Sequence, residues 1–111
     1  EADLLRDIRI ALGRDPDVIC WRSTTGATQE RDPAPGRTRT ICYGIGVGSA
    51  DLIGIVRGAF FAIEVKSASG RVSPAQRAWL DLVARHGATC GIARSVDDAL
   101  AIVERAKRGR S

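Results

Sequence analysis

The sequence predicts a single α/β domain whose mixed central sheet of about four strands is flanked by helices. Residues 52–65 form two apolar runs joined at Arg57-Gly58, which predicts an antiparallel hairpin. A helical pattern separates this hairpin from an apolar strand at 89–93. A strand–helix–strand order places the two strands parallel, so the sheet holds both orientations. With 111 residues, the chain can form one domain with one core over 1–111.

The first part of the chain predicts a helix over 1–13, ended by Gly13, and a strand over 18–21. A polar stretch rich in Gly, Pro and Arg follows over 23–40, where we expect a flexible basic loop. This loop would contact DNA or a partner subunit, or would simply be solvated. A short strand is expected over 40–43. The helix has apolar residues at its 3.6-residue period: Leu4, Leu5, Ile8, Ala11 and Leu12.

Two further helices are predicted after the hairpin. Ser73, Pro74 and Gln76 match a capping box with proline in the first helical position. Ser95 is the expected N-cap of the last helix, and a basic tail follows over 107–111.

Composition narrows the classes of partner. The net charge is +4, mostly from arginine, which favours nucleic acid over an uncharged partner, although ordinary solubilising charge is the alternative. No apolar run approaches the roughly 20 residues of a membrane span, so no membrane association is expected.

Three cysteines, Cys20, Cys42 and Cys90, lie in apolar, strand-like settings without a CxxC pair. Their odd number and spacing indicate small buried side chains in a reducing compartment rather than disulfides or a zinc site. We therefore expect an intracellular protein.

The glycines of Gly44-Ile-Gly-Val-Gly48 superficially suggest a nucleotide-binding loop. The full GxGxxG spacing is missing, a strand follows where a helix would be needed, and no Gly-Lys-Ser/Thr ending is present. We expect no nucleotide cofactor, and interpret these glycines as allowing close backbone approach near Asp51.

The hairpin places three charged residues in an apolar setting. If Arg57-Gly58 is a two-residue loop, Asp51 falls opposite Glu64, at a Cβ separation of roughly 4.5–5.5 Å where like charges are destabilising. Lys66 shares one face of the strand with Glu64. A divalent cation bound by both carboxylates would remove the repulsion. The alternative is an exposed Glu64–Lys66 ion pair on an edge strand.

Asp51, twelve intervening residues and Glu64-x-Lys66 resemble the site of the PD-(D/E)XK nucleases. Within that superfamily the chain resembles the VRR-NUC domain, the virus-type replication-repair nuclease, and looks like a small stand-alone member of the kind found in phages. This likeness implies the restriction-endonuclease-like αβββαβ core. Four segments carry it: Gly48-Ser-Ala-Asp-Leu-Ile-Gly54, Ile63-Glu-Val-Lys-Ser67, Gly70-Arg-Val-Ser-Pro-Ala-Gln76 and Ala93-Arg-Ser-Val-Asp-Asp-Ala99.

The resemblance implies a Mg²⁺-dependent phosphodiesterase acting on DNA, with Mn²⁺ as a substitute. Asp51, Glu64 and the backbone carbonyl of Val65 would bind the metal, and the carboxylate of Glu1 would complete its shell. Lys66 would orient the attacking water or stabilise the transition state.

Gln76 matches the family's helix glutamine near the lysine, although its capping role explains it equally well. Candidate DNA contacts are Arg22, Arg37, Arg39 and Arg71. The segment after the first strand, Arg22-Ser-Thr-Thr-Gly26, lacks the asparagine that related sequences often carry.

The function expected from these residues is an endonuclease acting on branched DNA, such as a four-way junction, and working as a homodimer. No separate sequence-reading module is visible, which favours recognition of shape and backbone. A restriction-type or nicking nuclease acting on linear duplex is the enzymatic alternative. A catalytically inactive DNA-binding module is the other.

Overall fold

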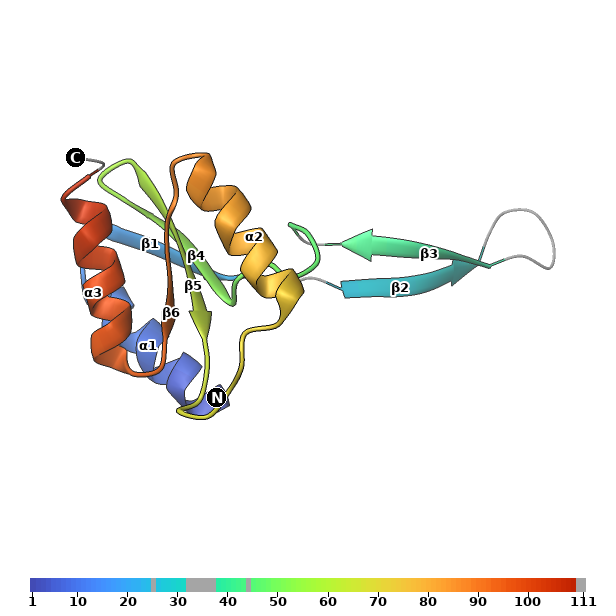
Figure 1. Ribbon diagram of the computed structural model, residues 1–111, viewed down its shortest axis with the longest axis horizontal. Coiled ribbons are helices and arrows are strands. Elements are labelled where there is room, and N and C mark those ends of the chain that lie inside the picture. Colours follow the sequence, from blue (N-terminus) through green and yellow to red (C-terminus); the bar gives the residue numbers. More distant parts are fainter. Residues whose placement is uncertain (25, 32–37, 44, 110–111) are drawn as a thin grey trace.

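The computed structural model describes residues 1–24, 26–31, 38–43 and 45–109, with 26–31 and 38–43 described as backbone only. It shows one α/β domain built on a four-stranded sheet of order β1-β4-β5-β6 (Figure 1), which confirms the predicted fold class. The elements are α1 (Ala2–Gly13), β1 (Val18–Arg22), β2 (Gly26–Arg31), β3 (Thr38–Tyr43), β4 (Leu52–Val56), β5 (Ala59–Val65), α2 (Pro74–Arg85), β6 (Thr89–Ala93) and α3 (Val96–Lys107).

The sheet is mixed because β1, β4 and β5 pair antiparallel while β5 and β6 pair parallel. The β4–β5 hairpin has the predicted register, with Val56 opposite Ala59. Its two turn residues, Arg57 and Gly58, have φ values of 51° and 81°. Positive φ at both positions is the geometry of a tight hairpin turn whose twist matches the strands. The register holds even though arginine is a poor residue for a positive φ.

Helices cover both faces of the sheet (Figure 1). α1 and α3 pack on one face, where Phe61 and Ile63 of β5 join the larger core cluster. α2 lies on the other face, where Trp79 and Leu80 pack against Ala62. β5 is therefore sandwiched between two apolar layers, and a side chain near its end is shielded from water on both sides.

The predicted starts of α2 and α3 are confirmed. The Ser73 side chain accepts a hydrogen bond from the Gln76 backbone N–H at 3.1 Å, and the Gln76 side chain accepts from the Ser73 N–H at 2.9 Å. Ser95 Oγ accepts from the Asp98 N–H at 3.1 Å. These caps fix where each helix leaves the sheet.

The segment before β4 packs against the first turn of α2. A Cβ at Gly48 would lie 2.4 Å from the Ala75 carbonyl oxygen, and Gly48 has a φ of +81°. The Trp79 indole N–H donates to the Ile45 carbonyl at 3.4 Å. The expected close backbone approach is thus confirmed at Gly48, with α2 as the neighbour. Gly44 lies outside the described residues.

The loop expected over 23–40 is corrected by the structure, because β2 and β3 pair there as a separate antiparallel sheet. This ribbon extends away from the four-stranded sheet along the 54 Å long axis of the molecule (Figure 1). The strand expected at 40–43 begins earlier, at Thr38, and joins β2 rather than the central sheet. Threonine, isoleucine and tyrosine in these segments favour strands, and this tendency outweighs the flanking turn residues.

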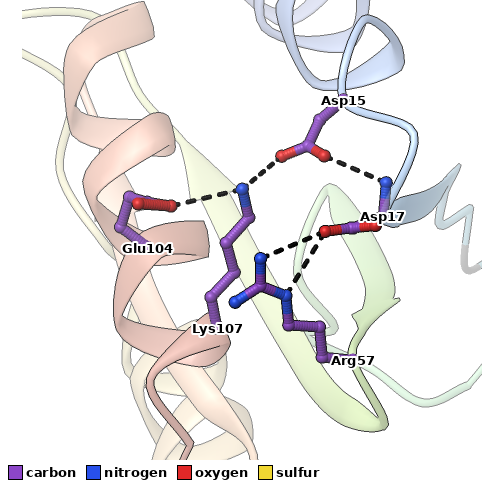
Figure 2. Close-up of polar contacts among 5 residues, drawn as sticks. All are labelled: Asp15, Asp17, Arg57, Glu104 and Lys107. Carbon is purple, nitrogen blue, oxygen red and sulfur yellow. Dashed lines mark hydrogen bonds and ion pairs between the residues drawn. The ribbon is translucent and has the colours of Figure 1, made fainter.

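An ion-pair network lies near the β4–β5 turn (Figure 2). This turn is the opposite end of the hairpin from Asp51, which directly precedes β4. Lys107 Nζ lies 2.6 Å from Asp15 and 3.3 Å from Glu104, while Arg57 contacts Asp17 at 3.2 Å. The hydrogen bond from Lys107 lowers the pKa of the Asp15 carboxyl. Lys107 is the last residue of α3, and its ion pair with Asp15 connects this helix to the α1–β1 turn. The basic tail was predicted to start at Lys107, so the structure corrects this start to the residue after the helix.

No helix within the described residues is long and apolar enough to cross a membrane.

Candidate functional site

The site is built at the open end of the β4–β5 hairpin. Asp51 directly precedes β4, and its Oδ2 atom accepts a hydrogen bond from the backbone N–H of Val65 at 2.8 Å. The Asp51 carbonyl accepts from the Ser23 N–H, also at 2.8 Å. The aspartate is therefore fixed to β5 by its side chain and to the segment after β1 by its backbone. This is the position that the predicted register assigned to it.

Glu64 is a charged residue buried in the core, with 1% of its surface exposed. It lies on β5, between β4 and β6, so the alternative of an exposed Glu64–Lys66 ion pair on an edge strand is wrong. Its Oε2 atom is buried and has no hydrogen-bond partner among the described residues. A buried carboxylate oxygen without a partner is costly and requires a cation or a proton nearby.

The electrostatics of Glu64 follow from this setting. The pKa of the Glu64 carboxyl is raised from 4.5 to about 8, and burial is the largest cause. A hydrogen bond with the Asp51 side chain and the negative charge of Asp51 also raise it. Lys66 lowers this pKa and Glu1 raises it. Burial and the neighbouring Asp51 carboxylate therefore favour the protonated form of Glu64 in the metal-free protein, because two adjacent carboxylates cannot easily both be ionised.

Lys66 follows β5 directly and is half-buried. Its backbone N–H donates to the Ala93 carbonyl at 3.0 Å, which continues the β5–β6 pairing past the strand end. Within the described part of the chain, the ammonium group forms no ion pair with Asp51 or Glu64, although it is close enough to influence the pKa of Glu64. The Lys66 charge is thus free to act on a third group.

A cavity of about 190 Å³ opens beside Asp51. Glu1 lies in its wall and is the N-cap position of α1, but its side chain forms no capping hydrogen bond. Glu1 also acts electrostatically on Glu64, which itself does not line this cavity. Arg22 brings a positive charge to the same wall. The complete lining is Glu1, Ala2, Leu5, Arg22, Asp51 and Val65.

The oxygen atoms gathered here suit a hard divalent cation. The Asp51 carboxylate and the orphaned Glu64 oxygen are the ligand type that Mg²⁺ and Mn²⁺ prefer, and Val65 lines the same cavity. No group of three or more His, Cys, Asp or Glu side chains positioned for a metal occurs in the described residues. The donor set therefore fits an ion held by two carboxylates, a backbone carbonyl and water.

The remaining predicted site residues are placed differently. The Gln76 side-chain oxygen is occupied by the capping box, and Gln76 does not line the cavity beside Asp51. Arg71 is exposed in the loop before α2. Arg39 belongs to β3, where side chains are not described, and Arg37 lies outside the described residues.

No role was predicted for Arg94, which the structure brings to the loop following Lys66. Its Nη1 atom donates to the Ser67 carbonyl at 2.7 Å and to the Gly70 carbonyl at 2.8 Å. The residue falls in a segment that resembles the family, but contacts across 24 to 27 positions of sequence have no local signal.

In a comparison with protein families, the model of the VRR-NUC domain matches residues 1–97. All the candidate residues of the site fall within this range. A search of curated proteins finds no significant match.

The Glu64 carboxyl predicts the pH dependence of stability in metal-free protein. Its folded pKa of about 8 exceeds the unfolded value near 4.5, so the folded state binds the extra proton between these values. Stability should then fall as pH rises from about 4.5 to 8, by at most about 1.4 kcal/mol per pH unit. Urea unfolding in EDTA measures this slope, and Glu64→Gln should flatten it. An unchanged slope in Glu64→Gln would contradict the assignment.

Proposed function

Because the chain belongs to the VRR-NUC family of nucleases, we propose that it is a divalent-metal-dependent endodeoxyribonuclease that cuts branched DNA, such as a four-way junction. One observation supports the metal dependence above others. The buried Oε2 atom of Glu64 has no partner in the described structure and lies next to a second carboxylate, Asp51. A divalent cation supplies the charge that this arrangement lacks.

In this proposal Asp51, Glu64 and the Val65 carbonyl hold Mg²⁺, or Mn²⁺ in its place, and Glu1 completes the shell. When bound, the ion lowers the pKa of water and neutralises charge on the phosphate. The hydrogen bond from the Val65 N–H occupies one oxygen of Asp51, and the other oxygen is the proposed ligand.

Lys66 orients the attacking water or stabilises the negative charge that develops on the phosphate. Its lack of an ion pair within the described residues supports this role, because an ammonium already neutralised by a carboxylate would stabilise the transition state less. Gln76 contributes through its Nε2 group, since its oxygen caps α2.

DNA recognition is proposed to depend on charge and shape. The net charge of +4 favours phosphate backbone contacts. Arg22 lines the cavity beside Asp51, which supports a contact with a phosphate near the cleaved bond. Arg71 is exposed in the loop that leads to α2, and Arg37 and Arg39 remain candidates by sequence.

A homodimer is supported by an uncovered part of the sheet. Ile19 and Ile55 face each other across β1 and β4 and are 57% and 42% exposed, while Trp21, opposite Ile53, is 49% exposed. These side chains lie on the face of α2, beyond the strands that α2 covers. An apolar surface of this kind suits a second copy of the chain better than a polyanion. Two copies related by a two-fold axis also match a symmetric junction.

The cleavage experiment compares a four-way junction with a linear duplex of matched sequence in Mg²⁺ or Mn²⁺. The unmodified chain should cut the junction faster. Asp51→Asn and Lys66→Ala should each lower the rate by about 10²- to 10³-fold or more, with DNA binding largely retained, because each removes transition-state stabilisation. Gel analysis of labelled strands measures the rates.

Asp81→Asn is the matched control for Asp51→Asn, since Asp81 is an exposed carboxylate on α2. Equal rates on junction and duplex would contradict the preference for branched DNA. No metal-dependent cleavage of any DNA form by the unmodified chain would contradict nuclease activity altogether.

The dimer surface predicts a change of molecular mass. The unmodified chain should elute as a dimer in size-exclusion chromatography with light scattering, and Trp21→Glu should convert it to a monomer by placing a charge in the apolar surface. Leu100→Glu is the control, because Leu100 is a comparably exposed apolar residue, 40% exposed, on α3, which packs on the opposite face of the sheet. A monomeric unmodified chain, or a dimeric Trp21→Glu variant, would refute this surface.

A further inference from the structure

A single arginine gathers the backbone of the loop that follows the proposed catalytic lysine. Arg94 comes directly after β6, and its Nη1 atom donates to the Ser67 carbonyl at 2.7 Å and the Gly70 carbonyl at 2.8 Å, with the Ala68 carbonyl at 3.5 Å. The same loop is closed internally by the Gly70 N–H, which donates to the Ser67 carbonyl at 3.1 Å. One cation thus holds three converging carbonyl groups.

Arg94 is itself held from the other side. Its backbone N–H donates to Asp98 Oδ2 at 2.9 Å, and Asp98 lies in the capped first turn of α3. The preceding residue, Ala93, accepts the hydrogen bond from the Lys66 N–H. The end of β6 is therefore hydrogen-bonded to Lys66 through the Ala93 carbonyl. The next residue, Arg94, is hydrogen-bonded to the loop beyond Lys66.

The loop also lies next to Glu1. A Cβ at Gly70 would be 3.2 Å from Glu1 Oε2 and 3.1 Å from Ser67 Oγ, so the loop backbone passes close to this carboxylate. If the loop moved away, the Glu1 side chain would lose this neighbour. The backbone that follows Lys66 would also no longer be held in place. Two groups of the proposed site thus depend on the same short segment, 67–70.

We propose that Arg94 is a positioning residue of the nuclease reaction, which fixes the 67–70 loop so that Lys66 and Glu1 keep their places beside Asp51 and Glu64. This inference rests on the proposed function. Arg94 acts through the loop and does not contact the substrate. Its side chain is exposed, so its removal leaves carbonyls that water can solvate, and the fold survives.

The test compares Arg94→Ala and Arg94→Lys with Arg105→Ala. Arg105 is a matched control, because its guanidinium also donates to a backbone carbonyl, that of Cys90 at 2.9 Å, away from the site. Arg94→Ala should lower kcat on the DNA that the unmodified chain cuts by roughly 10- to 100-fold, the effect of a misplacement near 1 Å. KM should stay within about threefold, since uniform binding is retained.

Two further readouts separate positioning from a merely structural role. Arg94→Lys should recover part of kcat, because an ammonium also donates to carbonyls but lacks the planar fork. Amide hydrogen exchange at 67–70 should accelerate in Arg94→Ala and not in Arg105→Ala, with both variants folded.

Unchanged kcat in Arg94→Ala, while the unmodified chain cuts DNA, would overturn the inference. A raised KM with unchanged kcat would also overturn it, by showing direct DNA binding. Absence of cleavage by the unmodified chain would instead refute the proposed function. Hydrogen exchange would then still decide whether Arg94 orders the loop.

Discussion

Two carboxylates held together at the end of one hairpin are the constraint on which the site depends. The β4–β5 register leaves Asp51 and Glu64 next to each other, and the layers of helices on both sides of β5 exclude water from Glu64. Neither carboxylate can relax away, because Asp51 is hydrogen-bonded to the Val65 N–H and Glu64 is confined within a central strand. Like charges so placed must be neutralised.

A proton on Glu64 satisfies this constraint in the metal-free protein, as its raised pKa indicates. A divalent cation would neutralise the two carboxylates more completely. Both carboxylates can coordinate it at once, and coordination positions remain for water and phosphate. Burial makes two adjacent carboxylates without a compensating charge unfavourable. The same burial therefore favours binding of a cation between them. Such strained charge arrangements are typical of functional sites.

The surrounding elements keep this end of the hairpin in place. α1 brings Glu1 to the cavity, β1 brings Arg22, and β6 supports Lys66 and the following loop through Ala93 and Arg94. The ion pairs of Lys107 and Arg57 connect the opposite end of the hairpin to α3 and to the α1–β1 turn (Figure 2). Both ends of the hairpin are thus fixed, which limits sliding of the two carboxylates relative to each other.

Local chemistry explains which features the sequence could predict. The two-residue turn determined the β4–β5 register, and hence the pairing of Asp51 with Glu64, while the Ser73 capping box located α2. The β2–β3 ribbon was missed because its turn-forming residues suggested a loop. Arg94 was missed because its partners are backbone carbonyls distant in sequence, which any residue can offer.

Binding of Mn²⁺ to the metal-free protein tests the central claim most directly. Isothermal titration calorimetry on the unmodified chain, Glu64→Gln and the Asp81→Asn control separates the buried carboxylate from exposed ones. We predict saturable binding by the unmodified chain and the control, and a loss of affinity of at least about tenfold in Glu64→Gln, the smallest effect typical even of residues outside the first ligand shell. Equal affinity in Glu64→Gln, or no binding by the unmodified chain, would contradict a metal site at Asp51 and Glu64.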